Sequence, residues 1–135
     1  CIGDAKFFID RSVAYAKSRK VFGREIGMNQ GIQFPLAKAY AEMEAAALMV
    51  KKSAKLFDSN LPCGPEANMA KLLSADASWK AAESAMQTFG GYGFAVEYDI
   101  ERKFRETRLY QVAPISTNMI LAYISQNILE LPRAY

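Results

Sequence analysis

The sequence predicts an all-α fold, an up-down bundle of about four main helices. Apolar residues recur at steps of three and four over two long stretches, Gln30 to Phe57 and about Pro65 to Phe89, which is the period of an α-helix. No stretch of useful length alternates apolar and polar residues as a strand does. The 135 residues, 51% of them apolar, suffice for a single domain with one hydrophobic core.

A first helix is expected over residues 2 to 18, as the end of a longer one. Its apolar positions follow helical spacing and are Ile2, Ala5, Ile9, Val13 and Ala16. From Arg19 to Gly27 two glycines and alternating charges break this pattern, so we expect a loop. In this loop Phe22 either fills a place in its own core, the commoner case, or anchors another chain. Arg19 is either solvated or directed at an anion.

The longest helix is expected from Gln30 to Phe57. Its apolar face consists of Ile32, Leu36, Tyr40, Met43, Ala47, Val50, Ala54 and Phe57. Pro35 is tolerable only near the first turn, so this helix should begin close to Asn29 or Gln30. Loop-forming residues fill positions 58–65, and a third helix should then run to Phe89. Its many alanines favour the helical state and let neighbouring helices approach closely.

Three glycines within four positions follow the third helix, in the stretch Gln87 to Phe94. Glycine enters left-handed conformations without steric cost and leaves its peptide groups bare. The stretch is therefore expected to cap the helix and turn the chain, and its bare backbone can also face a ligand or a second chain. A dinucleotide fingerprint of the Rossmann type needs a preceding strand, which the pattern lacks, so that interpretation is poor.

The last third of the chain carries two weaker patterns. Charges alternate from Glu97 to Arg108 with few apolar residues, which indicates a short surface helix or an extended connector. After Pro114, Ser116 can cap a last helix that extends through Leu129. Its apolar residues cover more than one face, so we expect this helix to be buried on several sides.

The composition excludes several classes of function. A net charge of +3 is too small to indicate a nucleic-acid partner, and no stretch approaches the roughly 20 apolar residues of a membrane span. Cys1 and Cys63 lack metal-ligand spacing and the chain has no histidine, which excludes zinc and imidazole chemistry from within it. Free thiols suit a reducing compartment, so we expect the cytoplasm, with the mitochondrial matrix as the alternative. The start at Cys1, inside a helical pattern, indicates a piece of a larger protein.

Four motifs in a fixed order resemble the C-terminal α-helical domain of the acyl-CoA dehydrogenase family, and the resemblance covers the chain from Ile2 to about Leu129. The motifs are Arg19-x-x-Phe22-Gly23-x-x-Ile26-x-x-x-Gln30, Met69-Ala70-Lys71, Gln87-x-x-Gly90-Gly91-x-Gly93-Phe94 and Arg102-x-x-Arg105-Glu106-x-Arg108. The resemblance implies that this is one domain of a three-domain flavoenzyme, with an N-terminal helical domain and a central β-barrel domain outside it. Such enzymes oxidise an acyl-CoA thioester to the enoyl-CoA, transfer a hydride to FAD and pass electrons to an electron-transfer flavoprotein.

The same resemblance implies the site residues. Those expected to contact FAD are Arg19, Phe22, Gln87, Gly90, Gly91 and Thr117. Arg19 and Phe22 would reach the FAD of a neighbouring subunit, and the bundle would build a homotetramer. Arg102, Arg105 and Arg108 would meet phosphate or carboxylates, with solvated or ion-pair roles at least as well supported for each. Gln30 is expected to cap or bridge the second helix rather than touch the ligand.

One departure from the family concerns the catalytic base. Many members carry a glutamate just before the last helix, whereas Val112 to Thr117 contain no carboxylate. Other members place the base one or two turns before the residue that is Cys1 here, so the base is expected upstream. Two alternatives stay open: a non-catalytic bundle that supports cofactor and oligomer, and a related flavin oxidase or monooxygenase. The isolated chain is expected to be inactive and to retain little FAD.

Overall fold

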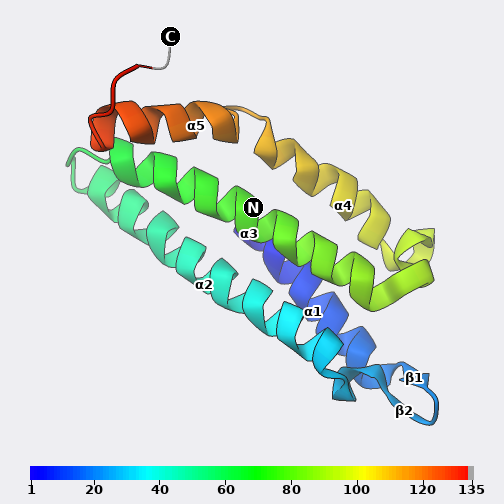
Figure 1. Cartoon of the computed structure of the whole chain (residues 1–135). Coiled ribbons are helices and arrows are strands. Elements are labelled where there is room, and N and C mark those ends of the chain that lie inside the picture. Colours follow the sequence, from blue (N-terminus) through cyan, green and yellow to red (C-terminus); the bar gives the residue numbers. More distant parts are fainter. Residues whose placement is uncertain (134–135) are drawn as a thin grey trace.

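The computed structural model describes residues 1–133, and five α-helices dominate it (Figure 1). The helices and strands are α1 (Ile2–Ser18), β1 (Lys20–Val21), β2 (Arg24–Glu25), α2 (Gln30–Asp58), α3 (Gly64–Phe89), α4 (Ile100–Arg108) and α5 (Thr117–Tyr123). Single turns of 3-10 helix fill most of the connections, and a π-helical turn (Ile124–Ile128) continues α5. The all-α prediction is confirmed, and the expected limits of the three long helices agree within about a residue.

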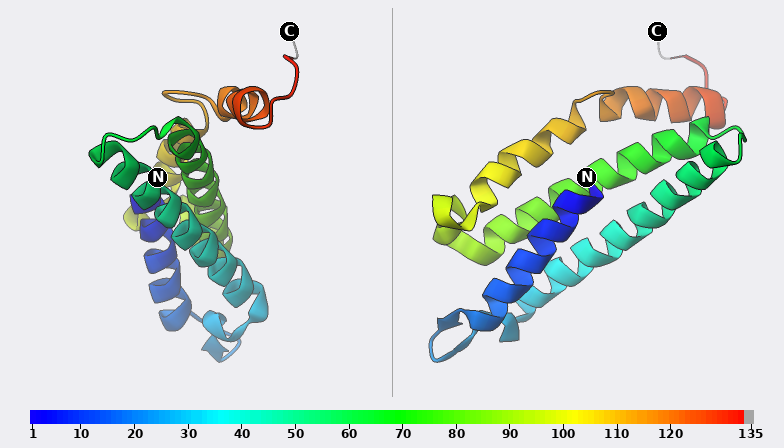
Figure 2. Two further views of the ribbon diagram at one scale, coloured as in Figure 1. Left: turned by 90° about the vertical axis from the view of Figure 1, so that its left-hand side faces the viewer. Right: turned by 180° about the vertical axis from the view of Figure 1, so that it is seen from behind.

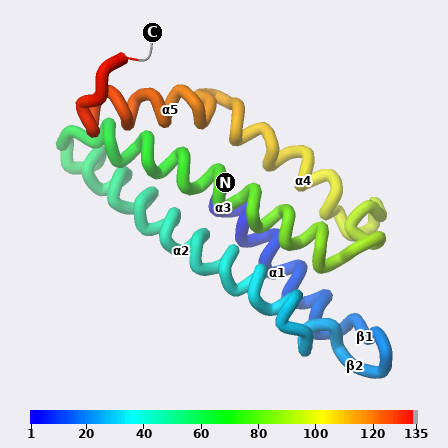
Figure 3. Tube along the Cα trace, in the orientation of Figure 1, coloured from blue at the N-terminus to red at the C-terminus, as the bar shows by residue number. Residues whose placement is uncertain are grey.

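The chain runs up and down through four legs (Figures 1 and 3). α1, α2 and α3 are successive antiparallel neighbours, while α4 and α5 together form a fourth leg that returns along α3. α3 packs against α1, α2, α4 and α5, so it is the central helix. Figure 2 shows α5 on the outer side of α3, away from α1. None of the helices in residues 1–133 is long and apolar enough to cross a membrane.

Small side chains on α3 form the centre of the core. Its buried alanines are Ala70, Ala75, Ala77, Ala81, Ala82 and Ala85. Because these residues have so little bulk, α1 and α2 approach closely, and Phe8 of α1 is fully buried in the same cluster. The predicted role of the alanines is thus confirmed. Phe8 escaped the sequence pattern because Ile9, beside it, already fitted the helical spacing.

The prediction that one apolar face of α2 is buried is wrong over much of the helix. Leu36 and Met43 are buried, but Tyr40, Val50 and Phe57 are exposed. In Figure 1 the start of α1 lies beside the middle of α3, so α1 does not extend along the last turns of α2. Helical periodicity shows where apolar residues line up, but not how far a neighbouring helix extends.

The last helix is likewise not buried on several sides. Ser116 caps it as expected, since its Oγ accepts a hydrogen bond from the Met119 backbone N–H at 3.3 Å. Within α5, however, Ile120 alone is buried, while Met119 and Leu121 are exposed. The reason is that α5 lies on one side of α3, and no other helix of the described chain covers its outer face.

Candidate functional site

A pocket lies at the end of the bundle where α1 and α3 end and α2 begins. Its volume is about 550 Å³, and it is lined by Tyr15, Arg19, Val21, Ile26, Asn29, Ile32 and the stretch Gln87–Tyr92. Four of the six residues expected at the cofactor, Arg19, Gln87, Gly90 and Gly91, therefore line one pocket. The tertiary structure brings them together from two helix ends that are about 70 residues apart in the sequence.

The glycine turn forms one wall of this pocket. Gly90 caps α3 with φ 57° and ψ −133°, a conformation that side chains other than glycine rarely adopt. A Cβ atom at Gly90 or Gly91 would meet nothing within 4 Å, so the space beside the Cα atom of each is open. Gly93 differs, because a Cβ there would lie 3.2 Å from the sulfur of Met86. Two glycines thus keep a backbone surface bare, while the third allows close packing.

Arg19 contributes a positive charge to the same pocket. It follows the last residue of α1, and its backbone N–H donates to the Tyr15 carbonyl at 2.8 Å. The guanidinium carbon lies 5.2 Å from the centre of the Tyr92 ring. No carboxylate within residues 1–133 forms an ion pair with Arg19. A guanidinium with free N–H groups beside bare peptide amides is a suitable binding site for an anion such as a phosphate.

An aromatic cluster joins α1 to the glycine turn. The rings of Tyr15 and Phe89 are stacked at 4.2 Å, and Tyr98 meets both rings edge-on. Tyr92 completes the cluster, with its ring 5.6 Å from that of Tyr98. Burial raises the pKa of Tyr15, so its hydroxyl stays neutral at physiological pH. Sequence reasoning missed Tyr15 and Tyr92; the signals were the one-turn spacing from Tyr15 to Arg19 and the place of Tyr92 inside the glycine turn.

Phe22 occupies the tip of a short hairpin where a loop was expected. Lys20 pairs with Glu25 and Val21 with Arg24, and Phe22 turns the chain with a φ of 52°. Its ring is fully exposed, so the expectation of a core residue is wrong, while the role as an anchor stays a prediction. The 3-10 turn after the hairpin, Ile26–Met28, is held by Gln33, whose side chain donates to the Gly27 carbonyl at 2.7 Å. Gln30, expected to form such a bridge, is the exposed first residue of α2.

Thr117 lies outside the pocket. It begins α5, on the fourth leg, and its hydroxyl is 3.5 Å from the Gln111 carbonyl oxygen. Within a single chain, Thr117 therefore does not line the pocket that Arg19, Gln87, Gly90 and Gly91 share. Its assignment stays a prediction.

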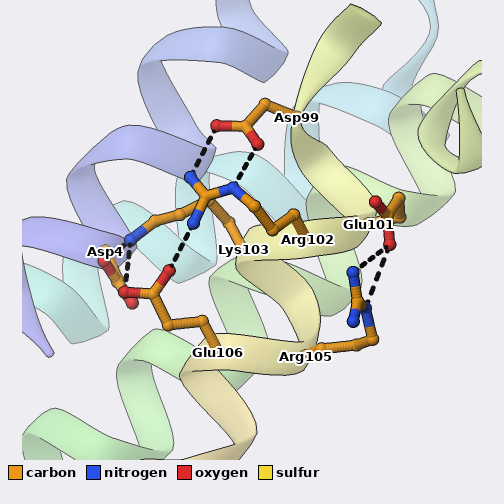
Figure 4. Close-up of polar contacts among 7 residues, drawn as sticks. All are labelled: Asp4, Asp99, Glu101, Arg102, Lys103, Arg105 and Glu106. Carbon is orange, nitrogen blue, oxygen red and sulfur yellow. Dashed lines mark hydrogen bonds and ion pairs between the residues drawn. The ribbon is translucent and has the colours of Figure 1, made fainter. Parts of the chain in front are cut away.

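The arginines of α4 are engaged inside the chain (Figure 4). Arg102 donates to Asp99 at 2.7 Å and to Glu106 at 2.8 Å, and Arg105 pairs with Glu101 at 3.0 Å. These hydrogen bonds hold the pKa of Asp99 below its ordinary value. Arg108 lies over the Trp79 ring at 5.1 Å. Of the two roles left open for Arg102 and Arg105, the structure shows the ion pairs.

The connector before α5 is fixed by α3 but contains no acid. The side chain of Lys71 donates to the Tyr110 carbonyl, and burial lowers the pKa of its ammonium group. Gln111 donates to Asp76 at 3.1 Å. In the following segment, Val112 to Thr117, Val112 and Ile115 are exposed and no carboxylate is present. No residue there can serve as the expected base.

The comparisons with known proteins agree with one another. The family model described as "Acyl-CoA dehydrogenase, C-terminal domain" matches residues 1–129. The acyl-CoA dehydrogenase FadE12 of Mycobacterium tuberculosis is 40% identical over 136 residues, covering 99% of this chain and 35% of FadE12. An acyl-CoA dehydrogenase of Bacillus subtilis is 43% identical over 111 residues, covering 82% of this chain and 29% of its own length.

Solved structures give the same result. A structure of glutaryl-CoA dehydrogenase in complex with glutaryl-CoA matches with a TM-score of 0.92 and 32% identity. The match covers 98% of this chain and 34% of that one. The chain therefore spans about a third of the length of the proteins it matches.

Proposed function

Because this chain belongs to the acyl-CoA dehydrogenase family, as its C-terminal helical domain, we propose that it forms half of an FAD site in a longer, three-domain enzyme. The observation that carries the proposal is the pocket that Arg19 and the bare Gly90–Gly91 turn both line. The fit is chemical: the pyrophosphate of FAD needs a cation with free N–H groups, and a close-lying dinucleotide needs a wall without side chains.

Each expected residue receives a role in this site. Arg19 binds the pyrophosphate, Gln87 offers its amide to the ADP part, and Gly90 and Gly91 leave room for it. Phe22, exposed at the hairpin tip, packs on the adenine side of an FAD held mainly by a second copy. Thr117, which begins α5 outside this pocket, contacts the FAD of its own subunit, so one chain serves two cofactors.

The proposed reaction is the α,β-dehydrogenation of an acyl-CoA thioester. Bound FAD supplies the hydride acceptor. The base that removes the α-proton lies upstream of Cys1, because the segment from Val112 to Thr117 has no carboxylate. We further propose that the full-length protein forms a homo-oligomer in the cytoplasm. It passes its electrons to an electron-transfer flavoprotein. The reported relatives are bacterial, which does not favour the mitochondrial alternative.

Two titrations test the proposal. In the full-length protein, an acyl-CoA substrate should bleach the absorbance of bound FAD; no bleaching with any straight or branched acyl-CoA would reject the dehydrogenase assignment and favour the non-catalytic alternative. The 135-residue chain alone should show little or no FAD binding, since half of the site is missing. Tight stoichiometric binding by this chain would contradict a composite site.

A further inference from the structure

Arg19 is an exposed side chain that something must hold in place before it can bind an anion well. Among residues 1–133 no carboxylate forms an ion pair with it, and its guanidinium carbon lies over the face of the Tyr92 ring, 5.2 Å from the ring centre. We propose that Tyr92 is the positioning residue for Arg19: its ring orients the guanidinium without using up its charge. This inference rests on the proposed function, because the anion is the phosphate part of an ADP-containing cofactor.

Tyr92 is itself held firmly enough to act as a platform. The turn that carries it is set by Gly90, with its positive φ, and by Gly93, which packs against the Met86 sulfur. The ring of Tyr98 lies edge-on at 5.6 Å, and that of Tyr15 lies at 6.4 Å. Tyr92 therefore has a fixed ring on the pocket side, and 45% of its surface is still exposed.

The kind of contact matters for binding. The face of an aromatic ring attracts a guanidinium but leaves the N–H groups at its edge free to donate to a ligand. Arg102 shows the opposite arrangement, because Asp99 and Glu106 accept from its N–H groups and balance its charge (Figure 4). An aromatic partner thus keeps Arg19 available for phosphate, which a carboxylate partner would not do.

A double-mutant cycle in the full-length protein, stripped of flavin, tests this role through the dissociation constant for added FAD. We expect Arg19→Ala to weaken binding roughly tenfold or more, as for loss of a hydrogen-bonded charge. Tyr92→Leu should weaken it roughly two- to fivefold, in keeping with an exposed cation–π contact. In the Arg19→Ala background Tyr92→Leu should have no further effect. Tyr92→Phe should bind as the unaltered protein does, because the ring faces Arg19.

Matched variants separate this role from a general effect on folding. Tyr40→Leu removes a similarly exposed tyrosine from another groove, and Arg11→Ala removes an arginine that also lies over an aromatic ring, that of Phe7. Both should leave FAD affinity unchanged, and thermal unfolding checks that every variant is folded. If Tyr92→Leu does not fold, Tyr92→Met replaces it.

The outcomes are distinct. Additive losses from Arg19→Ala and Tyr92→Leu, or unaltered affinity in Tyr92→Leu beside a weakened Arg19→Ala, would overturn the role of Tyr92 and leave the proposed function in place. Unaltered affinity in Arg19→Ala would instead reject the cofactor pocket itself.

Discussion

The hairpin end of the bundle holds a packed aromatic cluster, which the described residues of the α5 end lack. At the hairpin end, Tyr15, Phe89 and Tyr98 pack on one another, and Tyr15 and Phe89 also line the pocket. At the α5 end, exposed apolar residues remain on neighbouring segments: Phe57, Leu61, Met119, Leu121, Leu129 and Leu131. The first end is organised by the chain itself, whereas the second is a surface that suits contact with another protein surface.

The difference follows from how many elements meet at each end. At the hairpin end α1, α2, α3 and the start of α4 converge, so an aromatic cluster packs between them, while Phe22, Phe94 and Val96 stay exposed. At the other end α1 is absent and α5 lies on one side of α3. We infer that this exposed surface contributes to the proposed homo-oligomer, while the hairpin end contributes to the cofactor site.

The largest expected effect is the loss of unfolding free energy when a large apolar side chain is truncated at the hairpin end rather than at the α5 end. Phe89→Ala removes a side chain that is 5% exposed and should lower the free energy of unfolding by about 3–5 kcal/mol. Leu129→Ala, at a position that is 62% exposed, should change it by less than about 0.5 kcal/mol in the monomer. Urea unfolding of the 135-residue chain at low concentration measures both. Equal losses would show that the α5 end is as tightly packed as the hairpin end.

A glycine pair refines the account of the hairpin end. Gly90→Ala should cost about 1–3 kcal/mol of unfolding free energy, because alanine is strained at the positive φ of this position. Gly91→Ala is the matched control, since a Cβ there meets only open space, and it should cost less than about 0.5 kcal/mol. Urea unfolding again gives the values. A larger loss for Gly91→Ala than for Gly90→Ala would mean that lack of room for a side chain, rather than backbone conformation, requires glycine at these positions.

Self-association should depend on the α5 end. Met119→Ser combined with Leu129→Ser should weaken association of the 135-residue chain by on the order of tenfold for each side chain that the contact buries. Val96→Ser, which alters an exposed residue near the hairpin end, should have little effect. Sedimentation equilibrium over a range of concentrations decides between them. If the unaltered chain is monomeric at every concentration, the exposed surface at the α5 end does not drive self-association, and the proposed difference between the two ends is wrong.

The smallest effect concerns the ion pairs of α4. The folded state lowers the pKa of Asp99 through its bonds to Arg102, so this carboxylate stabilises the fold above the ordinary pKa of aspartate. That contribution should disappear as the pH falls through the lowered pKa. The unaltered chain should thus be slightly more stable than Asp99→Asn at neutral pH and equal to it in acid. Urea unfolding over a pH series tests the sign, and a gap that widens in acid would contradict it.

Much of the candidate site was predictable because its residues lie in local motifs. The glycine turn had to cap α3, and its backbone conformation is one that glycine adopts at little cost. Phe22 was the exception: a large aromatic residue in a loop is more often buried, and only the hairpin geometry showed its ring to be exposed. The partnership of Arg19 with Tyr92 was not predictable, since no sequence period relates the end of α1 to the turn after α3.

The sequence by itself determined where the helices begin and end, through the spacing of apolar residues, Pro35 near the start of α2, the Ser116 cap and Gly90. These signals act over a few residues, so they can be read without the fold. Only the tertiary structure decided which apolar faces are covered, because that depends on how far α1 and α5 extend beside α3. It also decided that Arg19 and the glycine turn share one pocket while Thr117 lies elsewhere.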